Sequence, residues 1–513
     1  MTDVVLGVDC STTASKVLAW DRQGRAVGEG RAPLTEIRPS AAYSEQVAEG
    51  WWDATSQALR QVVEAVGADR IAGLCITHQR ESYAPVDANN ASLRNAILWD
   101  DARAQAQLDE LGERFGHDEL HRRTGRGPSL TQSLPKLLWL VQNEPEVAAR
   151  AYKFMDTHGY LVQRLTGEFT TSLASADSFG ITDVEHDAWA EDLITGIGLR
   201  PEQFCDTVMP GTVIGEVKGE AAHATGVPAG TPVVAGLGDG QAACLGAGVT
   251  SLDRASLNLG TAVTGGPISD RYVADASCRT MYAGAPGTFL LEECLRGGTA
   301  TMTWFMRKFG DSFDVRANFD RYEAAAREVE VGAEGLILVP YWNGVMSPYW
   351  DGSATGTIVG WHWGHGREHL FRAIEEGIAY EFRLAMNGIE AATGERIGEY
   401  VILGGGSNSD LWCQIAADVL SATVVRTHTV EATNLGAGIL GAYGVGWYPT
   451  VEEAAVAMTD VAERFEPDER RTAIYDMLFN EVYKPLFPVV QPQLQRLVQV
   501  RAQLTPATTA PQS

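Results

Sequence analysis

The chain has 513 residues, 45% hydrophobic and 21% charged, a balance typical of a globular enzyme that is too long for a single core. It carries 40 Lys and Arg against 66 Asp and Glu, which gives a net charge of −26. A protein this negative repels nucleic acid and anionic membranes, so a phosphate-bearing substrate would need local positive groups or a bound cation.

The chain begins with two apolar runs joined by a polar turn. Val4–Val8 and Lys16–Trp20 each have the length of a short buried strand, and Asp9–Ser15 between them carries hydroxyls and one carboxylate. Backbone N–H groups in such a turn can hold a polyphosphate, with the lysine supplying charge and Asp9 facing a metal ion. The alternative is an ordinary β-hairpin whose Ser and Thr side chains bond their own backbone.

Two clusters of charged and aromatic residues follow. After the apolar run Ile71–Thr77, Arg80 and Glu81 offer donors and an acceptor to a polyol. Further on, Trp99-Asp100-Asp101-Ala102-Arg103 combines an aromatic face with carboxylates and a guanidinium. Both clusters are candidates for a sugar site. The alternative for each is a structural or surface ion pair, and surface pairs contribute little to stability.

An aspartate between glycines follows the apolar run that ends at Leu237. Asp239 in Gly238-Asp239-Gly240 would be exposed at a strand end, where it is a candidate general base for a substrate hydroxyl. The alternative is a turn aspartate. Soon afterwards Ser256–Leu259 meets Gly260-Thr261-Ala262, which repeats the strand-and-turn pattern of the N-terminus at about half the chain length.

This recurrence predicts two related halves. We expect an N-terminal domain over residues 1–248, with the sugar site, the first turn and Asp239. We expect a C-terminal domain over 249–502, with the second turn. The composition of residues 503–513 predicts a disordered tail.

Two glycine-rich segments lie in the last quarter of the chain. Val401–Leu403 opens onto Gly404–Gly406 ahead of a helical stretch, where a flat ring or a phosphate can approach the backbone. A tight strand-to-helix connection is the alternative. Gly436–Gly441 matches the dinucleotide spacing G-x-G-x-x-G, but the polar stretch His428–Asn434 precedes it instead of a strand. We interpret its small residues as a surface for close helix packing.

Five segments in register resemble the FGGY carbohydrate kinases, members of the actin-like ATPase superfamily. They are GVDCSTTASKVLAW from Gly7, GLGDGQAA from Gly236, NLGTAV from Asn258, GTIVGWHWGHGREHLFRAIEEG from Gly356 and ILGGGSNSDLWCQIAADVL from Ile402. The resemblance implies an α/β fold of two RNase H-like (actin-like ATPase) domains, each a mixed sheet flanked by helices. It also implies an interdomain cleft that closes over the substrates and expels water.

The resemblance also implies a role for each matching residue. Asp239 would be the general base and a candidate metal ligand, while Asp9 would orient Mg²⁺ through water and the γ-phosphate of ATP. The other implied contacts are to phosphate from Thr12, Thr13, Lys16, Gly260 and Thr261, to adenosine from Gly404, Gly405 and Asn408, and to the sugar from Arg80, Glu81, Trp99, Asp101 and Arg103.

Three positions depart from the family pattern. Ser11 stands where glycine is usual, so we expect a tighter or differently hydrated first turn. The segment THQRES around Arg80 resembles the form in glycerol kinases, yet Thr131 and Thr264 replace two aromatic residues of that form. The stretches YSEQ, LPKLLWL and ILWDDAR look more like pentulose kinases. The site is therefore expected to be roomier than glycerol requires.

We accordingly predict ATP-dependent phosphorylation of a small sugar hydroxyl, with a ketopentose such as D-xylulose as first candidate. The alternatives are a polyol kinase of the erythritol or glycerol type and a non-enzymatic sugar sensor that uses ATP as a switch. The expected cofactors are ATP and Mg²⁺.

The remaining features bear on location and partners. Seven scattered cysteines without a CxxC pair indicate neither a disulfide framework nor a zinc site. The N-terminal MTDVVLGVD lacks the pattern of a signal peptide, and the chain has no apolar run of about 18 residues. We expect a cytoplasmic protein that binds a small-molecule sugar, with no nucleic acid or membrane partner. A homodimer is a candidate assembly.

Overall fold

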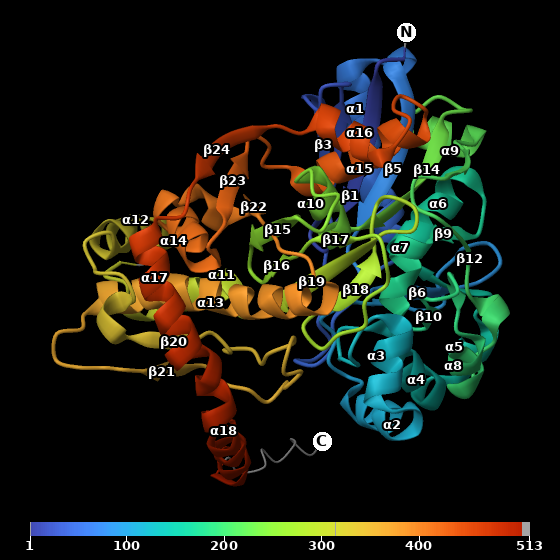
Figure 1. Ribbon diagram of the computed structural model, residues 1–513. Coiled ribbons are helices and arrows are strands. Elements are labelled where there is room, and N and C mark those ends of the chain that lie inside the picture. Colours follow the sequence, from blue (N-terminus) through green and yellow to red (C-terminus); the bar gives the residue numbers. More distant parts are fainter. Residues whose placement is uncertain (1, 313, 505–513) are drawn as a thin grey trace.

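A computed structural model describes residues 2–312 and 314–504 and shows a mixed α/β protein whose two lobes are each built on their own sheet (Figure 1). The first sheet has six strands in the order β13-β14-β5-β1-β2-β3. The second has eight, in the order β17-β19-β16-β15-β22-β23-β24, with β18 paired to β19. Helices flank both sheets, as the predicted two-domain α/β class requires.

Beside its main sheet, the first lobe contains a four-stranded sheet, two strand pairs, nine α-helices and three short 3-10 helices, counted over the described residues before β14. The main strands are β1 (Val4–Cys10), β2 (Ala14–Trp20), β3 (Ala26–Pro33), β5 (Ile71–His78), β13 (Val213–Glu216) and β14 (Pro232–Gly238). The minor strands are β4 (Glu45–Gln46), β6 (Tyr83–Val86), β7 (Ala96–Ile97), β8 (Lys153–Asp156), β9 (Thr170–Ser172), β10 (Thr182–Asp183), β11 (Ala188–Trp189) and β12 (Asp206–Val208). The helices are α1 (Glu49–Val66), α2 (Gln105–Phe115), α3 (His117–Thr124), α4 (Ser133–Asn143), α5 (Pro145–Arg150), α6 (Thr157–Thr166), α7 (Leu173–Ala176), α8 (Glu191–Gly196) and α9 (Gly219–Thr225).

The rest of the chain forms the second lobe and three helices that return to the first. The strands are β15 (Arg254–Leu259), β16 (Val263–Gly265), β17 (Ile268–Ser269), β18 (Arg279–Tyr282), β19 (Phe289–Leu295), β20 (Ile337–Val339), β21 (Thr357–Val359), β22 (Glu399–Leu403), β23 (Thr423–Thr427) and β24 (Val461–Phe465). The helices of the second lobe are α11 (Gly298–Phe309), α12 (Val315–Ala326), α13 (Arg367–Thr393), α14 (Asp410–Leu420), α17 (Glu469–Leu478) and α18 (Lys484–Leu504). The other three are α10 (Asp239–Gly246), α15 (Ala432–Gly444) and α16 (Val451–Met458).

The two sheets share a central pattern. In the first, β1 pairs antiparallel with β2 and parallel with β5. In the second, β15 pairs antiparallel with β16 and parallel with β22. The turn after β1 and the turn after β15 therefore occupy equivalent places, which is the recurrence that the sequence predicts. The boundary near residue 248 stays a prediction.

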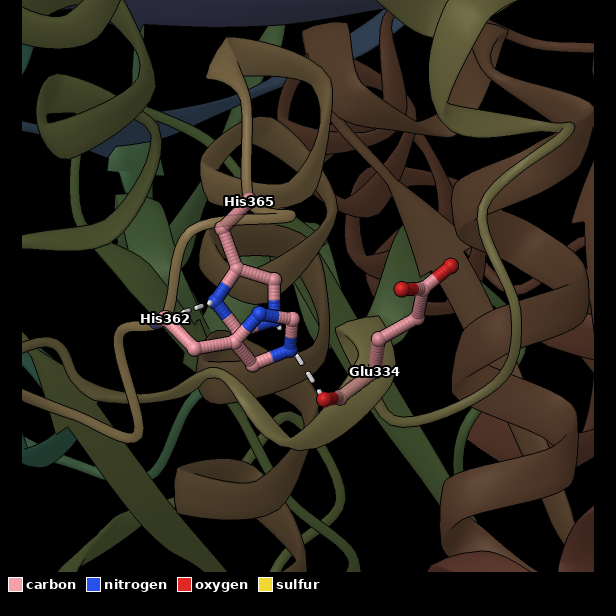
Figure 2. Close-up of side chains that lie close together, drawn as sticks. All are labelled: Glu334, His362 and His365. Atoms are coloured by element: carbon pink, nitrogen blue, oxygen red, sulfur yellow. Dashed lines mark hydrogen bonds between the residues drawn. The ribbon is translucent and has the colours of Figure 1, made fainter.

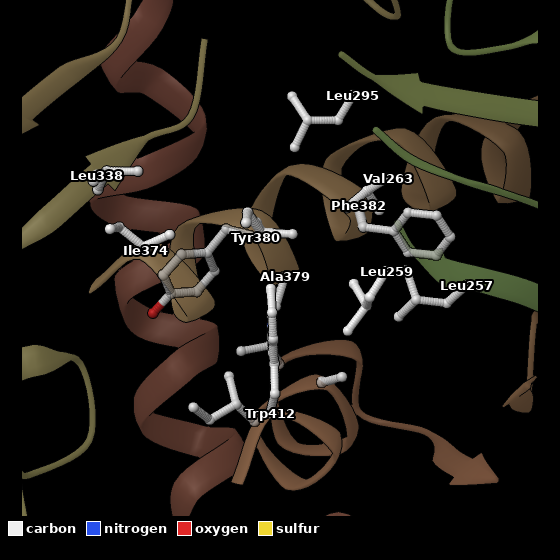
Figure 3. Close-up of a cluster of buried hydrophobic side chains, with 14 of the residues drawn as sticks. Leu257, Leu259, Val263, Leu295, Leu338, Ile374, Ala379, Tyr380, Phe382 and Trp412 are labelled. Carbon is white, nitrogen blue, oxygen red and sulfur yellow. The ribbon is translucent and has the colours of Figure 1, made fainter. Parts of the chain in front are cut away.

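The core of the second lobe fixes the place of the second turn. Leu257 and Leu259 of β15 and Val263 of β16 are buried in one cluster with Phe382 of α13 and Trp412 of α14 (Figure 3). Side chains alternate across a strand, so Leu257 and Leu259 face the helices together. The residues on both sides of the turn are thereby anchored in the core.

Helix α15, late in the sequence, packs on the first lobe beside β1, β5 and α10 (Figure 1). Its contact with α10 is made by backbone. A Cβ added to Gly436 would lie 2.0 Å from the Ala242 oxygen, and one added to Gly246 would lie 1.9 Å from the Ala432 oxygen. The motif Gly436–Gly441 is thus a helix-packing surface, as predicted, and this contact leaves no room for side chains.

The buried side chain of Asn434 forms three hydrogen bonds beside this contact. Asn434 donates to the carbonyls of Gly7 at 3.0 Å and Lys16 at 3.1 Å, and its own carbonyl accepts the Trp20 indole N–H at 2.8 Å. These bonds fasten α15 to the β1–β2 hairpin. Because the Asn434 side chain is buried, loss of these partners would leave its amide unpaired.

The C-terminal tail prediction is partly wrong. Helix α18 continues through Gln503 and Leu504, because Arg501, Gln503 and Leu504 are strong helix formers and the first proline of the tail comes only at residue 506. Residues 505–513 lie outside the described residues. Among the helices of residues 2–312 and 314–504, none has the length and apolar character needed to cross a membrane.

The helix contact yields a stability prediction. Gly436→Ala should destabilise the protein by about 1–3 kcal/mol, because the methyl group forces α15 away from α10. Gly219→Ala is the matched control, since Gly219 begins α9 and a Cβ there meets no atom within 4 Å. The midpoint of denaturant unfolding measures both variants. Equal midpoints for the two would contradict the close contact.

Candidate active site

The carboxyl ends of three parallel strands bring Asp9, Arg80 and Asp239 to one edge of the first sheet. In the strand register, the last residues of β1 and β14 both pair with His78, the last residue of β5. Residues at or just beyond these positions therefore lie side by side. This edge is where α/β sheets commonly place their ligands.

Asp239 begins α10 directly after β14. Its Oδ1 accepts the Gly240 N–H at 2.8 Å, and the residue remains exposed to solvent. The Arg80 side chain packs over Gly238, where an added Cβ would lie 2.5 Å from Arg80 Cδ. The surrounding protein desolvates the carboxylate and raises the pKa of Asp239, and the Arg80 guanidinium opposes this rise. An accessible carboxylate with these properties is suited to accept a proton.

Asp9 lies among other carboxylates. Burial raises the pKa of Asp9 to about 7, Asp239 and Glu431 add to the rise, and Lys16 opposes it. Asp9 Oδ1 is buried and has no hydrogen-bond partner among the described residues. An unpaired oxygen near further carboxylates matches the hard oxygen ligands that Mg²⁺ takes, so these residues fit a divalent cation held directly or through water.

The first turn is closed by its own serine. Both the Ser11 N–H and the Ser11 hydroxyl donate to the Ala14 oxygen, at 3.0 and 2.9 Å. The Thr12 hydroxyl donates to Gln79 Oε1 at 3.1 Å and accepts the Trp99 indole N–H at 3.1 Å. Thr12 therefore connects this turn to the segment after β5 and to Trp99.

Thr13 and Lys16, two further residues predicted to contact phosphate, differ in how free their side chains are to do so. The Thr13 side chain is exposed. The Lys16 ammonium donates to Glu431 at 2.6 Å and lies 3.4 Å from Glu29. Lys16 is thus paired with carboxylates in this structure, so its predicted contact with phosphate would require it to exchange these partners.

The second turn is shaped by the start of α11. The Gly260 carbonyl accepts both the N–H and the hydroxyl of Thr299, at 3.1 and 2.7 Å, and the Thr261 carbonyl accepts the Ala300 N–H at 3.2 Å. These bonds satisfy helix N–H groups that otherwise lack partners. The turn is held in one shape, with the Thr261 side chain in solvent.

A cavity of about 690 Å³ opens at the carboxyl ends of β22 and β23. This volume is typical of a small-molecule pocket, for which about 300–1,000 Å³ is usual. Gly404 adopts a φ of 79°, and a Cβ there would lie 2.5 Å from Asn258 Oδ1, so only glycine suits this wall. The lining includes Asn258, Gly404, Gly405, Asn408, Arg426 and Thr433. All three residues predicted to contact adenosine therefore share one pocket.

Arg80 and Glu81 lie in a buried network of charges. Arg80 Nη2 donates to Asp177 at 2.6 Å, and Arg80 Nη1 donates to Gln241 at 2.5 Å. Glu81 accepts from Arg126 at 2.6 Å and has a left-handed φ of 59°. A non-glycine residue in that region is strained, and such strain gathers at functional sites. Both predicted sugar-contacting groups are thereby held rigidly.

The residues of the second predicted sugar cluster differ in how accessible they are to a ligand. Trp99 is 42% exposed, so its ring face is available. Asp101 is buried and accepts the Ser44 N–H at 2.7 Å and the Arg103 guanidinium at 2.8 and 2.7 Å. Arg103 also donates to Glu45 at 2.7 Å. Asp101 and Arg103 thus pair with each other inside a structural network, and sugar contact by this pair stays a prediction.

The sequence reasoning missed several residues of the site. Asp177 and Arg126 hold Arg80 and Glu81, but their sequence neighbourhoods show no motif. Lys136 is fully buried and donates to the carbonyls of Glu81 at 2.9 Å and Thr131 at 2.7 Å, and burial lowers the pKa of Lys136 to about 8. A lysine within the apolar stretch LPKLLWL was a signal that could have identified it.

The comparisons with known proteins agree with this geometry. The sequence model for the N-terminal domain of the FGGY family of carbohydrate kinases matches residues 4–246, and the C-terminal domain model matches 255–445. Xylulose kinase from Bacillus subtilis is 28% identical over 487 residues, 94% of this chain and 96% of that protein. Glycerol kinase from Thermococcus gammatolerans is 30% identical over 485 residues, 92% and 95% of the two chains.

The solved structures lead to the same family. The crystal structure of xylulose kinase from Rhodospirillum rubrum has a TM-score of 0.90 at 26% identity and covers 96% of this chain and 100% of that one. The chain belongs to the FGGY family of carbohydrate kinases. It is a sugar kinase, and its family uses ATP, typically with a divalent metal ion.

The shifted Asp9 carboxyl gives a pH prediction. Native Asp9 keeps its proton up to about pH 7, whereas an unfolded aspartate loses it near pH 4, so the stability of the ligand-free protein should fall as pH rises between these values. Asp9→Asn cannot ionise. The variant should therefore gain up to about 4 kcal/mol of unfolding free energy over wild type at pH 8 relative to pH 4.

Chemical denaturation of the ligand-free protein between pH 4 and pH 8 measures this difference. The surface variant Asp69→Asn is the control, because Asp69 is exposed. Asp9→Asn should also lose the stabilisation that Mg²⁺ and ATP together give to wild type. A stability profile of Asp9→Asn parallel to that of wild type would contradict the assignment.

Proposed function

We propose that this FGGY kinase transfers the γ-phosphate of ATP to a hydroxyl of a ketopentose such as D-xylulose. The observation that carries the substrate class is the small side chain of Thr131 beside Glu81, since the Lys136 ammonium bonds both backbone carbonyls. Thr264 is the second small residue where the glycerol-kinase form has an aromatic one. Room at both positions suits a sugar longer than glycerol, and the similarity to named xylulose kinases supports the same class.

In the proposed reaction, Asp239 accepts the proton of the attacking hydroxyl. Its carboxylate is exposed at the start of α10, where the substrate can reach it. The nearby Arg80 guanidinium, fixed by Asp177, favours the ionised form before the proton is taken. The transferred phosphoryl group needs little covalent help from the protein, so positioning and charge compensation supply most of the catalysis.

The phosphates would be held between the two turns. Thr12 and Thr13 would contribute from the first lobe and Gly260 and Thr261 from the second, while Lys16 would exchange Glu431 for phosphate. Asp9 would hold Mg²⁺, which supplies charge neutralisation when bound. Convergence of both lobes on one triphosphate would exclude water from the transfer.

The adenosine would occupy the cavity at the ends of β22 and β23. Gly404 and Gly405 give it a wall without side chains, and Asn408 places an amide at the rim. A flat base can approach such backbone closely. With the base there, the triphosphate would extend toward the second turn, because Asn258 at the end of β15 lines the same cavity.

A polyol kinase is the second candidate. The Arg80–Glu81 pair resembles the glycerol-kinase form, and a named glycerol kinase is 30% identical to this chain. Glycerol or erythritol would then be the acceptor. The sensor alternative receives no support from membership of a kinase family. The proposed setting is the cytoplasm, and the 1–248 and 249–502 domain division and a homodimer also remain proposals.

A sugar panel tests the substrate. ADP release with Mg²⁺·ATP should be fastest with a ketopentose, by at least tenfold in kcat/KM over glycerol, erythritol and gluconate. A preference for glycerol or erythritol would favour the polyol candidate. Hydrolysis of ATP that is independent of any sugar would support the sensor instead.

Replacement of the base tests the mechanism. Asp239→Asn should lower kcat by about 10²–10⁴-fold, the usual contribution of general base catalysis, while the dissociation constant for ATP stays within about twofold. Asp270→Asn, an exposed residue of the same type, should keep wild-type turnover. Near-normal kcat in Asp239→Asn would remove this residue from the role.

A further inference from the structure

Two histidines and a glutamate that have no part in the proposed kinase reaction lie close together on the second lobe. His362 and His365 lie in the loop between β21 and α13, and Glu334 lies in the turn before β20 (Figure 2). One ligand atom of each residue lies within 4.8 Å of those of the other two. Two imidazoles with one carboxylate form a donor set that suits Zn²⁺ and similar divalent transition metals.

The hairpin of β20 and β21 sets Glu334 opposite His362. Its antiparallel register pairs Ile337 with Val359, and three residues further along the same register are Glu334 and His362. The two backbones stay close beyond the strands, because a Cβ on Gly360 would lie 2.1 Å from the Gly335 oxygen. The approach of Glu334 to His362 is therefore built into the fold.

A tight turn brings the second imidazole to the first. The His362 N–H donates to His365 Nδ1 at 3.2 Å, and the two ring centroids are 3.7 Å apart. His369, in the first turn of α13, places its Nε2 3.6 Å from Glu334 Oε1 and its ring centroid 5.2 Å from that of His365. Glu334 is thus within reach of three imidazoles.

The backbone around the glutamate is strained. Ala333 has φ 47° and Glu334 has φ 54°, both in the left-handed region that favours glycine. Each such residue costs about 1–3 kcal/mol, and such strain persists mainly where function requires it. Glu334 is exposed, so packing of its side chain does not repay this cost. A ligand bound by the Glu334 carboxylate would repay the cost of this strain.

The hydrogen bonds that a metal ion would displace are few and exposed. His362 Nδ1 accepts the Gly364 N–H at 3.0 Å. Metal binding at His362 Nε2 would move the ring proton to Nδ1, and the Gly364 N–H would then bond to water instead. Gly364 is exposed, which makes the exchange inexpensive. Metal binding at His365 Nε2 would replace its long contact of 3.3 Å to the Glu334 carbonyl, and the ring proton would move to Nδ1, which releases the His362 N–H. The net charge of −26 further favours a cation.

We propose that Glu334, His362 and His365 bind one Zn²⁺ or a similar divalent transition-metal ion, with His369 or water as the fourth ligand. The ion would fasten the loop between β21 and α13 to the turn before β20. This site is separate from the Asp9 carboxylates, and its ligands are nitrogen-rich instead of all-oxygen. The inference does not depend on the proposed sugar.

The test is a titration of the full chain with Zn²⁺ after removal of metals with a chelator and dialysis. Excess Mg²⁺ is kept present so that oxygen sites such as Asp9 are occupied. Isothermal titration should give one Zn²⁺ per chain, and Co²⁺ should give the intense visible bands of a tetrahedral site. The double variant H362Q/H365Q should bind Zn²⁺ more than about tenfold more weakly.

His223→Gln is the matched control, because His223 is exposed and outside the cluster; it should bind as wild type does. Glu334→Gln is the second variant. It keeps the shape of an exposed side chain, so its weakened binding would support the site even if the double variant folded poorly. The absence of stoichiometric Zn²⁺ binding by wild type, or equal binding by wild type and Glu334→Gln, would overturn the proposal.

Discussion

The structure depends on the contact between α10 and α15, where Gly246 and Gly436 let two helix backbones touch. Interiors are packed too densely to absorb an added methyl group at such a contact. Because α10 begins at Asp239, the position of this carboxylate is set by a helix from the other half of the sequence. The bonds of Asn434 to the β1–β2 hairpin fix the same helix on its other side. Fold and site are therefore stabilised by one junction.

Charge explains why the proposed site would need a cation. Asp9, Asp239 and Glu431 lie close enough to raise the pKa of Asp9, on a chain with a net charge of −26. A triphosphate entering alone would meet repulsion, and Lys16 is already paired with carboxylates. A divalent ion relieves both the carboxylates and the phosphates. In the ligand-free protein, burial and repulsion among the carboxylates raise the pKa of Asp9, and the protein is less stable for it. This is an example of stability given up for function.

Local pattern predicted what lies at strand ends. The turns at Asp9 and Gly260, the carboxylate of Asp239 and the pocket at Gly404 all follow short apolar runs, whose period and length are readable from sequence. The sequence did not indicate which side chains far apart along the chain would pair with each other. Lys16 pairs with Glu431, 415 residues away, and Asp101 accepts the N–H of Ser44, 57 residues away, because such partners are set by tertiary packing. Asp177 gave no signal at all, since its role comes from burial beside Arg80. The helical residues at 503–504 show that composition alone misplaced the start of the predicted C-terminal tail.

In the proposed reaction, the sugar site belongs to the first lobe, whereas the adenosine lies mainly against the second. The Thr12 hydroxyl links the first turn to Gln79 and Trp99, so the phosphate turn and the proposed sugar wall form one hydrogen-bonded unit. The second turn belongs to the other lobe, anchored through Leu259 and its core, and the cavity lies between Gly404 of that lobe and Thr433 of α15. Within the first lobe, the glycine contact between α10 and α15 is buried, whereas the Lys16–Glu431 pair is partly exposed and so contributes little. Asp239 thus begins a firmly packed helix, whereas Lys16 beside Asp9 is held by a weaker pair. An arrangement of this kind lets Lys16 exchange Glu431 for phosphate while the proposed base keeps its place.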